Sequence, residues 1–141
     1  MKTDTNVSSS RRKNRLAHFL APSHVRYTIM SANLSKELRE KHGVKSLPVR
    51  RDDEVMIVRG GFKDTKGKIN QVYRKRYCLY IEKVTKLRKN GATVRIPVDP
   101  SNVVLTKLKL TPDREELLRR KREGRGEGKG KYTQADVNAT N

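Results

Sequence analysis

The residues of this chain best suited to chemistry are clustered cations, and the chemistry they suit is the binding of phosphate. Lysine and arginine neutralise nucleic-acid phosphates without reading base sequence. The clusters comprise Arg11, Arg12, Lys13 and Arg15, then Lys63, Lys66 and Lys68, then Arg74, Lys75 and Arg76, and finally Lys86, Arg88 and Lys89. We expect each cluster to contact phosphate.

Two glycines lie in or beside the second cluster, and their backbone freedom suits the same chemistry. Glycine adopts positive φ without steric cost and lets the backbone approach a ligand closely. We therefore expect Gly60 and Gly67 at positive φ in a phosphate-binding loop. A Gly67→Val substitution should then damage this turn, because a β-branched residue tolerates positive φ poorly.

Catalysis and metal binding have little support in the sequence. The chain has 3 histidines and 1 cysteine, and His18 and His24 lie six residues apart with no cysteine nearby. This spacing does not make a metal site. Acid–base catalysis needs two groups that converge in one pocket, and no such pair is indicated. We predict no enzyme activity, no cofactor and no metal, and regard both histidines as candidate contacts to nucleic acid.

The overall composition indicates the class of partner. The 141 residues carry a net charge of +19, 33% are hydrophobic, and the mean hydropathy is −0.88. Such a charge requires a polyanion, either nucleic acid or an anionic membrane. We expect no membrane contact, because no stretch approaches the roughly 20 apolar residues of a spanning helix and no segment shows a broad apolar face. The lone Cys78 and the absence of an apolar signal segment predict an intracellular protein.

Charge and composition divide the chain into three parts. Residues 1–50 carry +8, residues 51–110 carry +9, and residues 111–141 carry +2. We interpret them as a basic N-terminal extension with short helices, a small β-domain, and a C-terminal helix with a flexible tail rich in glycine and lysine.

Two short helices are expected in the first part. Residues 1–15 are almost without apolar side chains and should be disordered in the free protein. Pro22-Ser23 predicts a helix to about Met30. Ser35 predicts a second helix over residues 36–42, which Gly43 would end in the left-handed conformation.

Five short strands are expected in the second part. They cover residues 55–58, 69–73, 76–82, 92–98 and 103–108. Their number and their tight turns predict a small closed barrel. The alternation in the third strand places Tyr77, Leu79 and Ile81 in the core and Cys78 and Tyr80 outside.

Further signals refine this reading of the strands and of the C-terminal helix. Alternation fails at Gln71-Val72, which predicts a bulge, and Asn90-Gly91 predicts a hairpin turn. Pro97 should lie at a strand end or on an edge strand. Thr111-Pro112-Asp113 predicts the start of a helix. This helix lacks a wide apolar stripe and should lie on the surface, with the ion pairs Glu115–Arg119 and Glu116–Arg120. No regular structure is expected for residues 123–130, where glycine alternates with charge.

The segment from Asp53 to Ile69 resembles the KOW motif, in which two strands flank a loop that contains glycine. The matching positions are Asp53, Val55, Ile57, Gly60, Lys63, Gly67, Lys68 and Ile69. One departure is Asp64, where the motif often has glycine. Asp tolerates the left-handed region better than most residues, so we expect the turn to survive.

The flanking segments resemble one family that contains this motif. They include residues 9–15, Ala17-His18-Phe19, Ala21-Pro22-Ser23-His24, Met30-Ser31-Ala32, residues 34–39, residues 47–50, residues 100–103 and Lys107-Leu108. The chain is similar over residues 8–122 to the universal large-subunit ribosomal protein twenty-four family, called twenty-six in older eukaryotic naming. The start of the chain and its long tail resemble eukaryotic members.

This resemblance implies a mostly β fold with an SH3-like barrel. It also implies binding to large-subunit ribosomal RNA near its 5′ end, a role early in assembly, and a place near the polypeptide exit tunnel. Neighbouring ribosomal proteins are implied partners, with no small-molecule substrate and no homo-oligomer. The expected location is the cytoplasmic ribosome, with assembly in the nucleolus if the protein is eukaryotic. The expected RNA contacts are Arg11, Arg12, Lys13, Arg15, His18, Ser23, His24, Arg26, Arg50, Arg51, Arg59, Gly60, Lys63, Lys66, Gly67, Lys68, Arg74, Lys75, Arg76, Lys86, Arg88 and Lys89.

Two alternative functions remain at this point. A transcription or RNA-processing factor also uses KOW motifs, but the N-terminal extension argues against it. An adaptor that binds polyproline needs an aromatic-lined groove, which is disfavoured by the absence of Trp and an aromatic content of 5%.

Overall fold

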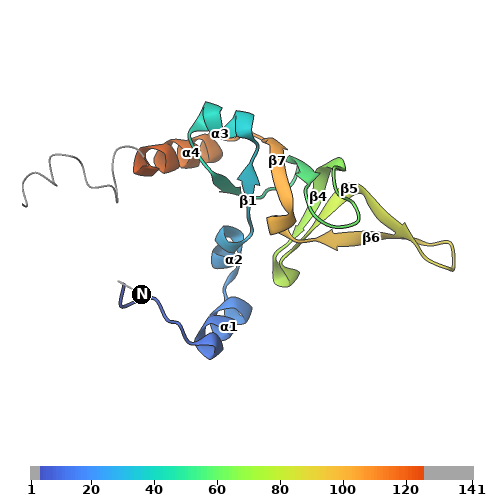
Figure 1. Cartoon of the computed structure of the whole chain (residues 1–141), viewed down its shortest axis with the longest axis horizontal. Coiled ribbons are helices and arrows are strands. Elements are labelled where there is room, and N and C mark those ends of the chain that lie inside the picture. The colour runs from blue at the N-terminus through green and yellow to red at the C-terminus, as the bar shows by residue number, and fades with distance from the viewer. Residues whose placement is uncertain (1–3, 126–141) are drawn as a thin grey trace, which may run out of the picture.

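Seven short strands form one mixed sheet, which Figure 1 shows with α1 and α2 below it and α4 to its left. The computed structural model describes residues 4–125. The strands are β1 (Ser31–Leu34), β2 (Ser46–Pro48), β3 (Glu54–Ile57), β4 (Lys66–Tyr73), β5 (Cys78–Leu87), β6 (Thr93–Val98) and β7 (Val103–Lys107). The helices are α1 (Arg11–Leu20), α2 (Ser23–Ile29), α3 (Lys36–His42) and α4 (Pro112–Arg125), with 3-10 turns η1 (Arg74–Arg76) and η2 (Pro100–Asn102).

The sheet is open, so the prediction of a closed barrel was wrong, although the small, mostly β character is confirmed. The strand order is β2-β1-β7-β3-β4-β5-β6. A barrel built from the five expected strands would close by pairing β6 with the free edge of β7. That edge is already occupied by β1, which runs parallel to β7 with Asn33 opposite Val104. Among the described residues, β2 and β6 therefore remain the two edges of the sheet.

The sequence interpretation missed β1 and β2, although both contribute to the core. Ala32, Leu34 and Leu47 on these strands are at most 2% exposed and belong to the same hydrophobic cluster as Val55 and Leu105. Residues on both sides of position 50 thus share one core. The domain limits at residues 50 and 110 stay predictions.

Helix α3 is confirmed, and α2 lies close to its expected position. The Ser35 hydroxyl accepts the N–H of Leu38 at 3.3 Å, and Gly43 ends α3 at a φ of 66°. Helix α2 begins at Ser23, one residue after Pro22, and ends at Ile29. The expectation of disorder was wrong for residues 11–15, which lie in α1. Tertiary contacts, described below, hold this segment against the rest of the protein, and a local reading of composition does not detect them.

The start of β5 differs from the expected alternation. Tyr77 precedes the strand in the left-handed conformation, at a φ of 53°, and is only half-buried. Cys78, expected outside, is 8% exposed, so the first two residues of β5 are both buried. Leu79 and Ile81 are buried as predicted.

The turn and edge signals of the strands are largely confirmed. The β5–β6 hairpin turns at Asn90-Gly91, where Gly91 has a φ of 81° and the N–H of Arg88 donates to the carbonyl of Ala92. Pro97 lies on the edge strand β6. The bulge in β4 lies at Asn70, one residue before the expected Gln71-Val72, because the register shifts between Ile69 and Gln71.

Helix α4 lies on the surface as predicted, with most of its described side chains exposed, but two buried side chains anchor it rather than the two predicted ion pairs. Leu118 is 5% exposed and Arg114 is 1% exposed. Neither predicted pair is among the ion pairs of the described residues, where the one within the helix joins Arg119 to Glu123 at 3.9 Å. The helix continues to Arg125, past the expected start of the irregular tail. Residues 126–141 lie outside the described residues.

Candidate nucleic-acid interface

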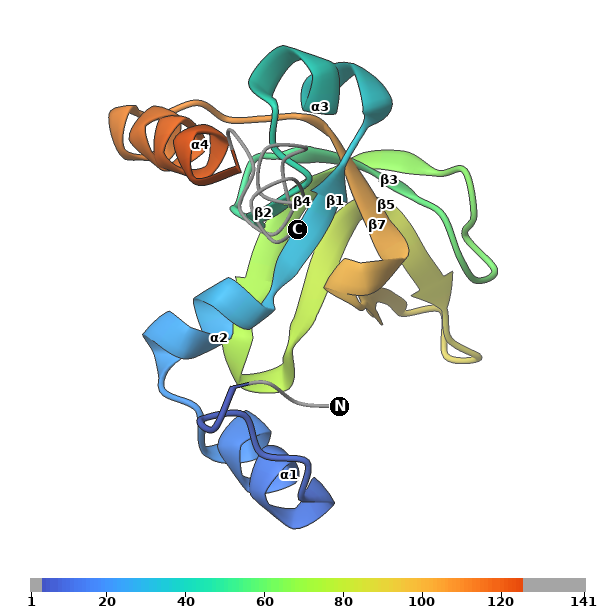
Figure 2. The same cartoon turned by 60° about the vertical axis from the view of Figure 1, so that its left-hand side comes forward.

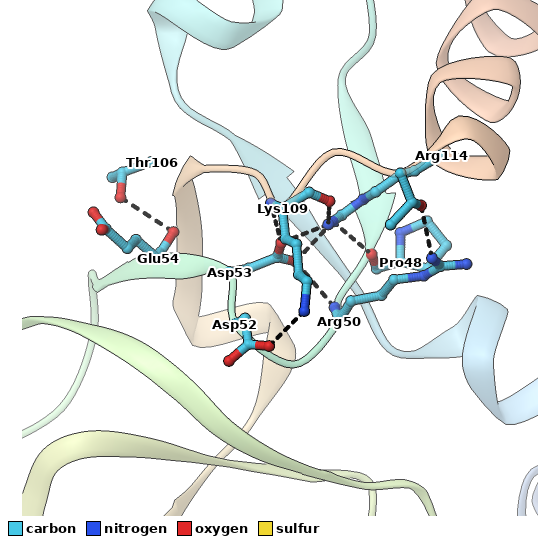
Figure 3. Close-up of polar contacts among 9 residues, drawn as sticks. Pro48, Arg50, Asp52, Asp53, Glu54, Thr106, Lys109 and Arg114 are labelled. Carbon is cyan, nitrogen blue, oxygen red and sulfur yellow. Dashed lines mark hydrogen bonds and ion pairs between the residues drawn. The ribbon is translucent and has the colours of Figure 1, made fainter.

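A buried ion pair joins the start of α4 to the start of β3 (Figure 3). Asp53 and Arg114 are 0% and 1% exposed. The Nη2 atom of Arg114 donates to Oδ2 of Asp53 at 2.7 Å, and its Nη1 atom donates to Oδ1. Arg114 also donates to the carbonyl oxygens of Lys109 and Pro48. Buried charges persist only when they are paired and hydrogen-bonded in this way, so the pair fixes the surrounding loops.

The same carboxylate orders two loops that carry cations. Asp53 accepts the N–H of Arg50 at 3.0 Å and the N–H of Lys109 at 2.9 Å. The side chain of Arg50 donates to the hydroxyl of Thr111 at 3.1 Å. Figure 3 shows Arg50, Asp52 and Lys109 together beside Asp53. The loop before β3 and the loop after β7 are therefore held side by side.

These loops form one wall of an open groove of about 870 Å³, which we call the basic groove. Helix α2, strand β4 and η1 supply the rest of its lining. The cations that line it are Arg50, Arg51, Arg74 and Lys109, with His24 beside them. Three of the expected RNA-binding segments, which are distant in sequence, thus meet at one place.

One carboxylate also lines the basic groove. Asp52 lies 2.7 Å from the Nζ of Lys109 and 3.4 Å from the Nζ of Lys68. The hydrogen bond from Lys109 lowers the pKa of Asp52, and the charges of the two lysines act in the same direction. Asp52 is therefore ionised near neutral pH and offsets part of the lysine charge. Arg50, Arg51 and Arg74 remain as the groove's main cations for a phosphate.

Arg26, expected to contact RNA, has a structural role as well. Its Nε donates to the carbonyl of Ala21 at 2.7 Å, and one Nη donates to that of Phe19 at 2.6 Å. The other Nη reaches the carbonyls of Lys75 at 2.9 Å and Arg74 at 3.4 Å. One guanidinium thus ties the end of α1 to η1.

Tyr77 makes a second link between α1 and η1. Its hydroxyl donates to the carbonyl of His18 at 2.5 Å, and the two rings stack with their centroids 4.2 Å apart. Arg26 lies 5.0 Å from the centroid of the Tyr77 ring. The His18 ring therefore has one face packed against protein, although the residue as a whole is exposed.

These links hold the C-terminal end of α1 against η1, so the two cation-bearing elements lie at one end of the molecule, as Figure 2 shows for α1, α2 and the β4–β5 turn. Arg74 donates to the hydroxyl of Ser23 at 3.0 Å. The clustered side chains are exposed: Arg11, Arg12, Lys13, Arg15, Ser23, His24, Arg74, Lys75 and Arg76. We call this surface the arm cluster. Sequence alone predicted both groups but not their proximity.

Helix α1 also exposes apolar side chains, contrary to the expectation that no segment has an apolar face. Leu16, Phe19 and Leu20 are 60%, 56% and 71% exposed. The interpretation missed them because residues 11–15 were not expected to be helical. Within residues 4–125, no helix is long and apolar enough to cross a membrane.

The loop between β3 and β4 carries the next group of expected contacts. Gly60 has a φ of 98°, as expected, and Asp64 a φ of 64°. An added Cβ at Gly60 would meet no atom within 4 Å, so its backbone is accessible. The side chain of Arg59 donates to the carbonyl of Ser101 at 2.9 Å. Lys63 in the loop and Lys66 and Lys68 at the start of β4 are exposed.

Gly67 does not have the predicted positive φ. The structure gives another reason for glycine at this position. An added Cβ would lie 2.6 Å from the carbonyl oxygen of Glu82 and 2.8 Å from the side chain of Ile81. Gly67 thus permits the close approach of β5 to β4, and its contact with a phosphate stays a prediction.

The last group of expected contacts lies on the protruding β5–β6 hairpin. Lys86, Arg88 and Lys89 are exposed at its tip. Figure 1 shows this tip on the opposite side of the sheet from α4 and away from α1. The structure therefore does not join it to the arm cluster.

Sequence reasoning missed several residues of the basic groove. Tyr27, Asn70, Gln71 and Lys109 line it but were not among the expected contacts. The break in alternation near Asn70 was the available signal, because bulges often lie beside functional sites. No cluster of His, Cys, Asp and Glu within residues 4–125 could hold a metal ion.

Comparison with known proteins identifies the family. A family model that describes the eukaryotic ribosomal proteins L26 and their archaeal counterparts matches residues 8–121. The chain belongs to this family. The relatives named large ribosomal subunit protein uL24 include one from Caenorhabditis elegans, 49% identical over 98% of this chain and all of the relative. The Dictyostelium discoideum relative is 54% identical over 98% of this chain and 100% of its own length. That of Schizosaccharomyces pombe is 54% identical over 86% of this chain and 96% of its own.

Membership in this ribosomal protein family confirms the resemblance inferred from the flanking segments. The matched region begins before α1 and ends within α4, so it includes the arm cluster, the basic groove and the hairpin. The family is one of structural ribosomal proteins, and the chain is accordingly a structural protein rather than an enzyme.

Proposed function

We propose that this chain is a structural constituent of the large ribosomal subunit that binds ribosomal RNA mainly through phosphate and sugar. The names of its relatives support the subunit. The observation that carries the RNA-binding part is the arm cluster, in which Arg26 and Tyr77 hold the cation-bearing helix α1 against η1. Such a surface, with a net charge of +19 on the chain, suits a polyanion.

The proposed contacts comprise more than the arm cluster. The basic groove contributes Arg50 and Arg51, the β3–β4 loop contributes Lys63, Lys66 and Lys68, and the hairpin tip contributes Lys86, Arg88 and Lys89. These surfaces point in different directions, so the RNA would have to surround the protein rather than dock on one face. Recognition by shape follows, because phosphate contacts carry no base sequence.

The proposal includes the context that the resemblance implies. The protein would act early in subunit assembly, beside neighbouring ribosomal proteins near the exit tunnel. It would reside in cytoplasmic ribosomes after nucleolar assembly, and would need no membrane, small-molecule substrate or second copy of itself. Family membership favours this function over a transcription factor or a polyproline adaptor.

Sedimentation of cell lysate through a sucrose gradient in high-salt buffer tests the proposal. We expect the chain to co-migrate with large subunits, because RNA that surrounds an integral component retains it by shape even when salt weakens the phosphate contacts. Release into the light fractions would contradict the proposal and favour a transient factor.

A further inference from the structure

The bulge in β4 directs two neighbouring amides to the same place. Ile69 pairs with Ile81 and Gln71 pairs with Tyr80, so Asn70 is the extra residue. Neighbouring side chains of a regular strand point to opposite faces. Asn70 and Gln71 are instead both exposed and both line the basic groove, which is the kind of re-aiming that a bulge produces.

These amides are available to a ligand. Neither side chain makes a hydrogen bond to another residue in the described part of the chain. A carboxamide presents a donor and an acceptor side by side. The edges of nucleic-acid bases present the same pair, which is why Asn and Gln read bases by two hydrogen bonds.

The groove also contains a surface on which the face of a base can stack and arginines that can bind a phosphate. The guanidinium carbon of Arg74 lies 5.1 Å from the centroid of the Tyr27 ring, and aromatic rings and guanidinium planes are the surfaces on which unpaired bases stack. Arg74 is held by the hydroxyl of Ser23, and Arg50 by that of Thr111. Two arginines are thus positioned before any ligand arrives, which reduces the entropy lost on binding.

The dimensions of the groove favour one nucleotide over a helix. Its volume of about 870 Å³ lies within the range of pockets that hold a single small ligand, about 300–1,000 Å³. In a paired RNA helix the Watson–Crick edges face each other, and the major groove is too deep and narrow for side chains to read the remaining edges. A base that has left the stack presents its edge and its faces together.

We propose that the basic groove binds one unpaired nucleotide of an RNA, with Asn70 and Gln71 hydrogen-bonding the base edge. Arg74, which lies over the Tyr27 ring, stacks on the base, and Arg50 and Arg51 contact its phosphate. The proposal rests on the proposed function, because it supposes an RNA ligand, and it adds a base-reading contact to a surface otherwise described as reading shape.

Binding of the full-length protein to labelled RNA hairpins tests this inference by fluorescence anisotropy. One hairpin is fully paired, and four others carry a single unpaired A, G, C or U in the stem. We expect at least one unpaired version to bind about tenfold more tightly than the paired hairpin, the size of one good base contact. The double variant Asn70→Ala/Gln71→Ala should lose this preference and keep its affinity for the paired hairpin.

Two further variants make the test decisive. Asn33→Ala removes an exposed asparagine of β1 that lies outside the groove, and it should keep the preference. Gln71→Glu keeps the size of the side chain and should lose the preference by removing a donor, even if the double variant folds poorly. Retention of the preference in Gln71→Glu and in the folded double variant would overturn the inference. If all hairpins bind equally and salt weakens the binding, the inference about the unpaired nucleotide is overturned but the proposed function stands. If no hairpin binds, the proposed function is overturned as well.

Discussion

The sheet body (residues 30–125) and the N-terminal arm (residues 4–29) are each held by an arginine, but in different surroundings. Arg114 in the body is 1% exposed and faces a carboxylate that is 0% exposed. Arg26 in the arm is half-buried and donates only to backbone carbonyls. Both residues are arginines, so their different surroundings determine how much the loss of each would lower the free energy of unfolding.

This difference separates stability from binding. Removing one partner of a buried ion pair leaves an uncompensated charge, which is strongly destabilising. A hydrogen bond in a partly solvated site contributes only about 0.5–1.5 kcal/mol, because water replaces the lost partner. The body should therefore carry the free energy of unfolding, and the arm should carry RNA-binding charge at little cost to the fold.

The largest effect is expected for the buried carboxylate. Asp53→Asn should lower the free energy of unfolding by about 3–5 kcal/mol, because Arg114 is left buried without a counter-charge. Urea denaturation measures it. Asp52→Asn is the matched control on the neighbouring carboxylate, and it should cost far less, because solvent screens its ion pairs. Equal losses for the two variants would break the distinction between buried and exposed pairs.

A smaller effect is expected at Gly67, where β4 and β5 approach closely. Gly67→Ala should destabilise the protein by about 1–3 kcal/mol, because the new Cβ would overlap the carbonyl of Glu82 and force β4 and β5 apart. Thermal and urea unfolding measure the change. The control is Gly61→Ala, since a Cβ there meets no atom within 4 Å and its φ is not positive. A Gly67→Ala protein as stable as the control would refute the packing explanation.

Loss of a contact in the arm should destabilise the arm itself and leave the sheet body largely unchanged. Arg26→Ala should lower the free energy of unfolding by about 1 kcal/mol and loosen the attachment of α1 to η1, which Tyr77 alone would then maintain. Hydrogen exchange should then accelerate at the amides of α1, with little change in the β3–β7 pairs. Arg95→Ala, on the exposed side of β6, should leave exchange in α1 unchanged. Faster exchange throughout the sheet would instead show that Arg26 stabilises the whole fold and not only the arm.

The smallest effect on stability is expected for the charges of α1, although they matter for binding. Replacing Arg11, Arg12, Lys13 and Arg15 by Gln should leave the unfolding midpoint unchanged, because all four are exposed and Gln is a good helix former. The dependence of RNA affinity on salt should flatten by about 0.7–0.9 of a log unit per lost phosphate contact. The control replaces the exposed Lys36, Lys41 and Lys45 around α3 by Gln, and the dependence of its RNA affinity on salt should stay unchanged. An unchanged slope for the α1 variant would show that α1 does not touch phosphate.

Elements determined by local signals could be predicted from the sequence. The Ser35 cap and Gly43 define α3 within one segment, and Asn90-Gly91 defines the β5–β6 turn. Strands β1 and β2 could not be predicted, because their short sequences, Ser-Ala-Asn-Leu and Ser-Leu-Pro, lack the β-branched residues that indicated the equally short β3. Their stability comes from β7 and the core, which lie far away in sequence. The need for glycine at position 67 was predicted for a wrong reason, since the contact with Glu82 exists only in the paired sheet.

The sequence by itself determined the net charge, the positions of the cation clusters and the family, because these depend on residue type and order alone. Only the tertiary structure decided that Arg114 is a buried anchor and that Arg26 joins the arm to η1. It also placed Asn70 and Gln71 in the groove with Arg50. The physical reason is that the role of a polar side chain depends on its burial and its partners, and long-range packing determines both.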